Sequence, residues 1–147
     1  MNLKIKLLTI LFVAGLTSLF GQEWQTDFNT AQQIAQEKYR PIILVFQGSD
    51  WCAPCIKLDR EVWSTDEFQK YAKDHYVMLQ ADFPRKKQNA LPEDRARANA
   101  QLAEQYNKNG IFPFVVVMDA QGKVKGETSY KKMNPKDYIQ LLDSFTE

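Results

Sequence analysis

Two kinds of apolar pattern alternate along the chain. Continuous runs of β-branched and aromatic residues occur at residues 42–46 and 114–118, and such runs are typical of strands covered on both faces of a sheet. Residues 76–83 alternate, with Val77, Leu79 and Ala81 on one side, and predict a third strand. Between these strands, apolar residues recur every three or four positions, which is the period of a helix packed against a sheet.

Start and stop signals divide the rest of the chain into helices and connections. Helices are predicted over residues 29–38, 53–63, 65–75, 92–108 and from 135 onwards. Residues 23–28 predict a short edge strand or an extended lead-in. Residues 123–130 predict a hairpin partner for the strand at 114–118. Residues 84–91 predict a loop. In the helix at 53–63 the side chains available for burial are Ile56, Leu58, Val62 and Trp63.

This element order predicts an α/β fold. Strands joined by crossover helices give parallel pairs, and the closing hairpin adds antiparallel pairs. We therefore expect one domain over residues 22–147, with a central mixed sheet and helices on both faces.

Residues 1–21 have the features of a secretory signal peptide. Lys4 and Lys6 precede an apolar run of 14 residues at positions 7–20, which ends at the small residue Gly21. The run is shorter than a usual membrane-spanning helix. We expect cleavage after Gly21 and a periplasmic or secreted protein, with an uncleaved membrane anchor as the alternative.

The charge of the expected mature chain bears on its partners. Without the two lysines of the leader, 17 basic residues face 18 acidic ones. This balance gives no sign of nucleic acid or an anionic membrane as a partner. The basic run Arg85-Lys86-Lys87 is expected to be a charged loop, with steering of an acidic partner as the alternative.

The chain has two cysteines, Cys52 and Cys55, which are separated by two residues. In an exported protein such a pair suggests a structural disulfide. A bridge that closes so small a loop removes little entropy from the unfolded chain. Redox chemistry therefore explains the pair better than structural stabilisation does.

The position of the cysteines favours this chemistry. They follow a predicted buried strand and open a helix, where free N–H groups and the helix dipole stabilise a thiolate at Cys52. We expect Cys52 to be exposed and to attack a substrate disulfide, and Cys55 to be shielded and to resolve the mixed disulfide. Pro54 stiffens the first turn without losing a helical hydrogen bond.

The segment Asp50-Trp51-Cys52-Ala53-Pro54-Cys55, directly after the strand at residues 42–46, resembles the active-site segment of the thioredoxin superfamily. The run Ser49-Asp50-Trp51-Cys52, the following Lys57-Leu58-Asp59, the loop at 84–91 and the leader resemble exported bacterial thioredoxin-like proteins. The resemblance implies a thioredoxin fold and thiol–disulfide exchange without a cofactor.

The resemblance also implies a substrate-binding segment. The family places a cis-proline opposite the cysteines, before a central strand, and Pro113 occupies that position. The backbone of Phe112 would then pair with an extended substrate. Trp51 is expected to cover the active-site disulfide. The alternatives are a trans proline that begins a strand and a tryptophan that only packs locally.

Two positions depart from the family pattern. Phe46 stands where many thioredoxins have a buried aspartate that accepts a proton from the second cysteine. The candidates to replace that aspartate are Asp59, Lys57 or a water molecule, and the alternative is that both side chains are solvated helix residues. Phe114 replaces a small or polar residue beside the proline, which predicts a narrower or more apolar peptide groove.

The expected activity is reduction or isomerisation of protein disulfides, because the Ala53-Pro54 dipeptide resembles that of reducing family members. The expected partners are protein or peptide thiols and disulfides and an electron-donor thiol protein, and the expected form is a monomer.

Other functions compete for the same motif. A structural zinc needs four ligands, and the chain adds only one histidine to its two cysteines, so no metal site is expected. Covalent haem would need a histidine where Ile56 stands. Copper delivery and a peptide-binding, chaperone-like role on the same fold stay open.

Overall fold

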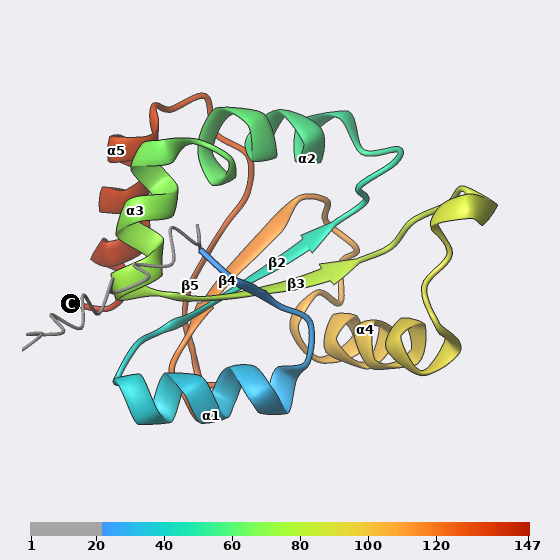
Figure 1. Cartoon of the computed structure of the whole chain (residues 1–147), viewed down its shortest axis with the longest axis horizontal. Coiled ribbons are helices and arrows are strands. Elements are labelled where there is room, and N and C mark those ends of the chain that lie inside the picture. The colour runs from blue at the N-terminus through green and yellow to red at the C-terminus, as the bar shows by residue number, and fades with distance from the viewer. Residues whose placement is uncertain (1–21) are drawn as a thin grey trace, which may run out of the picture.

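The computed structural model describes residues 22–147, so the predicted leader and its cleavage point lie outside the described residues. Figure 1 shows the elements around one sheet. In chain order they are β1 (Trp24–Gln25), α1 (Phe28–Lys38), β2 (Ile42–Gln47), α2 (Ala53–Leu58), the π-helical turn η1 (Asp59–Trp63), α3 (Asp66–His75), β3 (Val77–Asp82), the 3₁₀ turn η2 (Lys87–Asn89), α4 (Glu93–Tyr106), β4 (Phe114–Met118), β5 (Val124–Thr128) and α5 (Pro135–Ser144).

The five strands form the mixed sheet that the sequence predicts. Their order is β1-β3-β2-β4-β5. β3 runs parallel to both β1 and β2, whereas β4 is antiparallel to β2 and to β5. β2 therefore lies in the centre of the sheet, with a hydrogen-bonded neighbour on each side.

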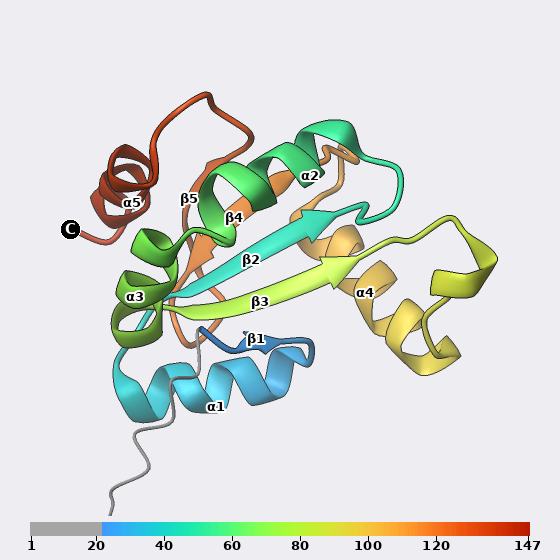
Figure 2. The same cartoon turned by 45° about the horizontal axis from the view of Figure 1, so that its top comes forward.

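Both faces of the sheet are covered, as the continuous apolar runs predict. On one face Ile43 and Val45 pack with residues of η1, α3 and α5. On the other, Ile42, Leu44 and Phe46 pack with residues of α1 and α4. Figure 2 shows this division, with α1 and α4 on the side of the sheet opposite α2, α3 and α5. β2 is thus fixed by packing on both sides, and its last residue leads directly to the cysteines.

Two predicted strands are shorter in the structure than the sequence predicts. The Asp27 side chain accepts a hydrogen bond from the Thr30 N–H and starts α1 at Phe28, so β1 keeps only two residues of the predicted 23–28. The predicted strand at 123–130 is reduced to Val124–Thr128.

The predicted helix at 53–63 changes its winding after Leu58. The Ser64 N–H donates to the Asp59 carbonyl, five residues back, so η1 holds one residue more than an α-helical turn. In an unbroken α-helix, Trp63 would share a face with Ile56, seven residues earlier. The wider turn rotates Trp63 into the core and leaves Ile56 46% exposed. The predicted burial of Ile56 is therefore wrong, while Leu58, Val62 and Trp63 are buried.

Candidate active site

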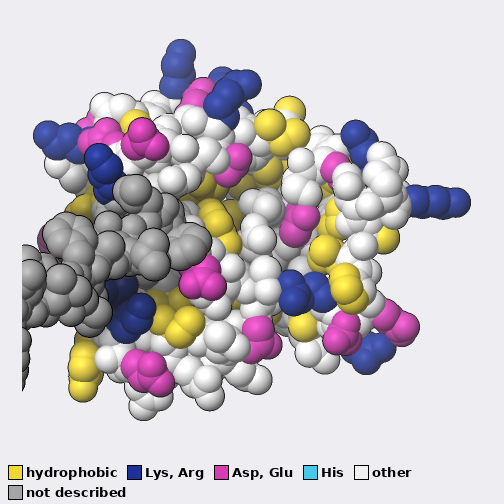
Figure 3. Space-filling model, viewed as in Figure 1, with side chains coloured by type: hydrophobic (Ala, Val, Ile, Leu, Met, Phe, Trp, Pro, Cys, Tyr) yellow, Lys and Arg dark blue, Asp and Glu magenta, His cyan; other side chains and the backbone are white. Residues whose placement is uncertain are grey.

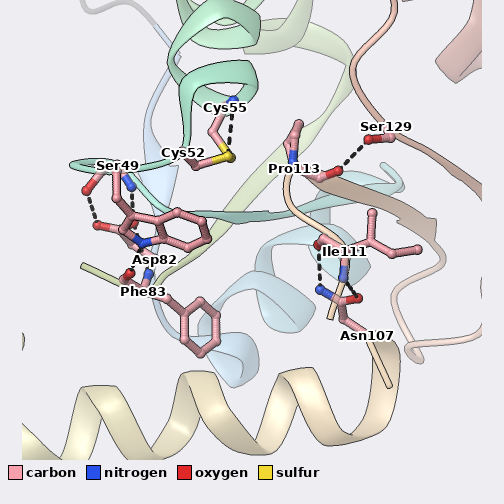
Figure 4. The surroundings of a disulfide bond; sticks show 10 residues. Ser49, Cys52, Cys55, Asp82, Phe83, Asn107, Ile111, Pro113 and Ser129 are labelled. Carbon is pink, nitrogen blue, oxygen red and sulfur yellow. Dashed lines mark hydrogen bonds between the residues drawn. A yellow bond between two sulfur atoms is a disulfide. The ribbon is translucent and has the colours of Figure 1, made fainter. Parts of the chain in front are cut away.

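Cys52 and Cys55 lie at the carboxyl end of the central strand. After β2 the chain turns at Gly48, whose carbonyl accepts the Cys52 N–H at 2.9 Å. Cys52 is the N-cap of α2, and its Sγ accepts the Cys55 N–H at 3.3 Å. The two sulfur atoms form a disulfide across Cα atoms 5.2 Å apart. The sequence prediction of a cysteine pair at a helix start is confirmed in this geometry (Figure 4).

Both cysteines are buried in this disulfide form. Cys52 is 3% exposed and Cys55 is 4% exposed. The prediction that Cys52 is exposed is wrong here, because its Sγ turns back over the first turn of α2, and Pro113 faces the pair from the other side (Figure 4). In this form the two cysteines do not differ in exposure. They differ in position, because Cys52 is the N-cap of α2 and Cys55 lies within its first turn.

The loop that carries the cysteines is fastened to the end of β3. The Asp82 carboxylate accepts the Ser49 N–H at 2.9 Å and the Ser49 hydroxyl at 2.6 Å. The Asp82 carbonyl accepts the buried Asn99 side chain at 3.0 Å, which ties the same point to α4. Sequence reasoning missed Asp82. Its signal was a carboxylate at the end of a strand next to β2, at the same edge of the sheet as the cysteines.

The Trp51 indole is held by contacts on several sides. Its Nε1 donates to the Phe83 carbonyl at 2.7 Å, and its ring meets the Phe112 ring edge to face with centroids 5.5 Å apart. A Cβ placed on Gly48 would lie 2.2 Å from Trp51, so the indole lies directly against the Gly48 backbone. These contacts link the cysteine loop to the residue before Pro113. That Trp51 also covers the disulfide stays a prediction.

Asp50 organises the loop after β3. Its carboxylate accepts the N–H groups of Arg85 and Lys86, each at 2.9 Å, and the Asn89 side chain at 3.1 Å. The hydrogen bond from the Arg85 backbone is the main reason that the pKa of Asp50 lies below its usual value. The Arg85 guanidinium lies 3.6 Å from the centre of the Trp51 ring. The predicted loop at 84–91 is therefore attached to the active-site segment through hydrogen bonds to Asp50 and the contact of Arg85 with Trp51.

The segment around Pro113 is fixed from two directions. The Phe112–Pro113 peptide bond is cis. The Ser129 hydroxyl donates to the Pro113 carbonyl. The buried Asn107 side chain makes a pair of hydrogen bonds with the backbone of Ile111, at 2.8 and 2.9 Å. Figure 4 shows these anchors beside the disulfide. Neither Asn107 nor Ser129 had a local sequence signal for this role.

The two departures from the family pattern contact each other. Phe46 and Phe114 are paired in the β2–β4 register, and their rings stack with centroids 6.3 Å apart. Both belong to the core cluster that faces α1 and α4. The prediction that Phe114 narrows the peptide groove is therefore wrong, because this side chain fills the core next to Phe46.

The two candidate proton-transfer side chains have other partners. The exposed Asp59 carboxylate accepts the Ser64 hydroxyl at 3.0 Å. Lys57 lies 4.0 Å from the Glu61 carboxylate and 5.3 Å from the centre of the Tyr130 ring. Within residues 22–147, neither side chain hydrogen-bonds to a cysteine, so the geometry does not assign them to Cys55.

Residues 22–147 contain no group of three or more His, Cys, Asp or Glu side chains that could hold a metal ion. In the same range, no helix has the length and apolar character needed to cross a membrane.

A Cys-x-x-Cys pair at the start of the helix that follows the central strand of a mixed sheet defines the thioredoxin-like class. The sequence pattern of the thioredoxin-like family matches residues 23–120, and the chain belongs to this family.

Particular relatives narrow the comparison. The chain is 33% identical over 122 residues to the disulfide bond reductase DsbH of Chlamydia pneumoniae, a match that covers 83% of this chain and 71% of that protein. A solved DsbH oxidoreductase structure superposes with a TM-score of 0.78 at 32% identity, over 86% of this chain and 85% of that one. A Thermus thermophilus thioredoxin, at 15% identity and a TM-score of 0.63 over 86% of this chain and 88% of that one, shares the fold. The chain is a thiol–disulfide oxidoreductase with Cys52 and Cys55 as its redox pair.

Proposed function

We propose that the protein reduces or isomerises disulfides of exported polypeptides, with Cys52 as the nucleophile and Cys55 as the resolving thiol. The observation that carries this proposal is the position of Cys52 as the N-cap of α2, where its Sγ already accepts a backbone N–H. A sulfur atom in that place is stabilised as a thiolate once the disulfide is reduced.

The exchange proceeds in two steps. In the reduced protein the Cys52 thiolate attacks one sulfur of the substrate disulfide, forms a mixed disulfide, and releases the other substrate sulfur as a thiolate. The Cys55 thiolate then attacks Cys52 Sγ, which forms the Cys52–Cys55 disulfide and releases the second substrate sulfur. The substrate gains the two electrons that the cysteine pair loses. Cys55 gives its proton to solvent before it attacks, and the two released substrate thiolates take protons from solvent. An electron-donor thiol protein returns the pair to its reduced form.

The proposed substrate-binding surface lies between the two segments that meet at the disulfide. Phe112 and Pro113 present backbone for pairing with an extended substrate, and Trp51 supports Phe112 through ring contact. Ile56 and Ile111 are large exposed hydrophobic side chains directly next to these segments. Apolar side chains around a redox pair favour a polypeptide substrate with an unfolded or extended segment.

Ala53 and Pro54 support the reducing direction, because this dipeptide resembles that of reducing members of the family. The similarity to a protein named disulfide bond reductase supports the same direction. We therefore expect a reduction potential nearer to the −270 mV of thioredoxin than to the −120 mV of a strong periplasmic oxidant.

The proposed location is the periplasm or the exterior, with the leader removed after Gly21 and the mature protein a monomer. The charged start, apolar run and small terminal residue at positions 1–21 support export. Mass spectrometry of the protein from its native envelope is expected to give a chain that begins near Gln22. A mass that includes Met1 to Gly21 would contradict cleavage.

The assignment of the two sulfur atoms is tested by trapping. In Cys55→Ser the mixed disulfide formed by Cys52 has no internal thiol to resolve it, so covalent complexes with substrates should accumulate on non-reducing gels. Cys52→Ser and the variant with both substitutions serve as controls and should trap few or none. Equal trapping by Cys52→Ser would overturn the assignment of Cys52 as the nucleophile.

The same preparation distinguishes an enzyme from a peptide-binding module. Catalytic amounts of the wild-type protein should accelerate the reduction of insulin by dithiothreitol, and the variant with both cysteines replaced should not. A protein that binds peptides without redox catalysis would leave the rate unchanged.

A further inference from the structure

Three consecutive exposed cations lie in a loop that contacts the active-site segment. Arg85, Lys86 and Lys87 follow β3 in the loop that Asp50 fastens to the cysteine segment. Figure 3 shows dark-blue side chains projecting from the end of the molecule that carries this loop. The anchoring by Asp50 gives these cations a defined place next to the active site.

The carboxylates of Asp50 and Asp82, which lie beside this loop, are already engaged. Asp50 accepts hydrogen bonds from the loop backbone, and Asp82 accepts the Ser49 N–H and hydroxyl. Both aspartates are half-buried, whereas the three cations are exposed. Among residues 22–147, the ion pairs involve other basic residues: Lys57, Arg97 and Lys125. Glu93 and Asp94, which follow the loop at the start of α4, are exposed, but Glu93 is paired with Arg97 and Asp94 accepts the Arg95 N–H. Within residues 22–147 the three loop cations therefore have no ion-pair partner.

Arg85 has a fixed orientation that suits carboxylate binding. Its guanidinium lies over the Trp51 ring at 3.6 Å, and Trp51 in turn contacts Phe112. A guanidinium placed over an aromatic ring keeps the N–H groups at its edge free, and these form a fork that matches a carboxylate. Arg85 is thus placed at the rim of the surface proposed to bind substrate, beside the residue that precedes Cys52.

We propose that Arg85, with Lys86 and Lys87, binds an acidic side chain of the substrate within a few residues of its reactive cysteine. The protein would then prefer disulfides in acidic polypeptide segments. This inference rests on the proposed function, because it names the substrate class of the same site. The contact is direct and lies on the rim, so it is expected to change the rate of encounter and orientation more than the chemical step.

The test compares two synthetic peptides with the same internal disulfide, one with Glu and one with Gln at the positions within four residues of a cysteine. Reduced protein is mixed with each peptide, and the second-order rate constant of a single turnover is measured. The ratio of the rate constants for the Glu and Gln peptides reports the preference. We expect a ratio of about three to ten at low salt, which falls as salt screens the exposed charges.

Three variants identify the source of the preference. R85Q/K86Q/K87Q should bring the ratio close to one. K70Q/K73Q/K136Q removes the same charge from exposed positions on α3 and α5 and should keep the wild-type ratio. R85K keeps the charge but loses the planar fork, so its ratio should fall between those of the wild type and the triple loop variant.

The outcomes separate this inference from the proposed function. Equal rates for the two peptides, or a ratio that the loop substitutions leave unchanged, would overturn the acidic preference while the reductase activity stands. A full ratio in R85K would overturn the role of the guanidinium fork. Failure of the wild-type protein to reduce either peptide would overturn the proposed function itself, and with it the inference.

Discussion

At the scale of single residues, the least expected contact is between a glycine and a tryptophan. Gly48 directly follows the central strand β2, and the Trp51 indole lies against the Gly48 backbone. Gly48 is not one of the glycines with positive φ, so its backbone does not require glycine. Space is what requires it, because any side chain at this position meets the indole.

Gly48→Ala is expected to displace Trp51, because the added Cβ would lie 2.2 Å from its Cε2 atom. Forcing a methyl group into a packed site typically costs about 1–3 kcal/mol. The measurement is urea unfolding followed by circular dichroism. In a Trp51→Ala background the same substitution should cost much less, since the obstacle is gone. An equal cost in both backgrounds would show that Trp51 is not the reason for glycine.

At the scale of elements, α3 and α5 are joined by a shared carboxylate. The Tyr71 and Tyr76 hydroxyls donate to the two oxygens of Asp143, at 2.5 and 2.6 Å. The hydrogen bond to Asp143 is the main cause that raises the pKa of Tyr71 to about 12. Burial is the main cause of the higher pKa of Tyr76, and Asp143 adds to it. Both tyrosines therefore hold their protons more firmly in the folded protein.

This arrangement predicts a loss of stability in alkali. Unfolded tyrosine titrates near pH 10, so between pH 10 and about 12 the unfolded chain releases protons that folded Tyr71 retains. The stabilisation is complete below pH 10 and is lost as the pH rises. The urea midpoint should fall over this range, and less steeply in Tyr71→Phe. Tyr39→Phe is the matched control, because Tyr39 is 95% exposed, and it should follow the wild type.

At the scale of the whole molecule, the redox state and the stability of the fold are linked. The free energy of unfolding of the oxidised protein minus that of the reduced protein equals 2F times the potential of the pair in the unfolded chain minus its potential in the folded chain. About 30 mV corresponds to 1.4 kcal/mol. A protein whose folded pair has a lower potential than the same pair in the unfolded chain is therefore more stable when oxidised.

We expect the oxidised protein to have the higher urea midpoint, together with a potential in the lower half of the range for this fold. Equilibration with glutathione gives the potential, and unfolding with and without dithiothreitol gives the stabilities. The variant with both cysteines replaced should unfold identically in the two conditions. A more stable reduced form with a potential near −120 mV would reverse the proposed direction of electron flow.

The local pattern of the sequence determined the order of the main helices and strands and the position of the redox pair. The runs at residues 42–46 and 114–118 predicted strands buried on both faces. Successive side chains of a strand point to opposite faces, so a strand that is covered on both faces needs apolar residues at every position. The Cys-x-x-Cys spacing after such a strand predicted the pair at a helix start, because both features are local in the chain.

Tertiary structure decided the surroundings of that pair. The anchors from Asp50 to Arg85 and from Asp82 to Ser49 join residues more than 30 positions apart, and many polar residues of the sequence would have been equally plausible partners. In the sequence, Phe46 and Phe114 are two separate departures from the family pattern. The antiparallel pairing of β2 and β4 places them opposite each other, so that their rings stack. The burial of Cys52 likewise depended on a distant segment at Pro113. Periodicity reports how a residue relates to its chain neighbours, whereas the site is made by groups that only the packing of the sheet and its loops brings together.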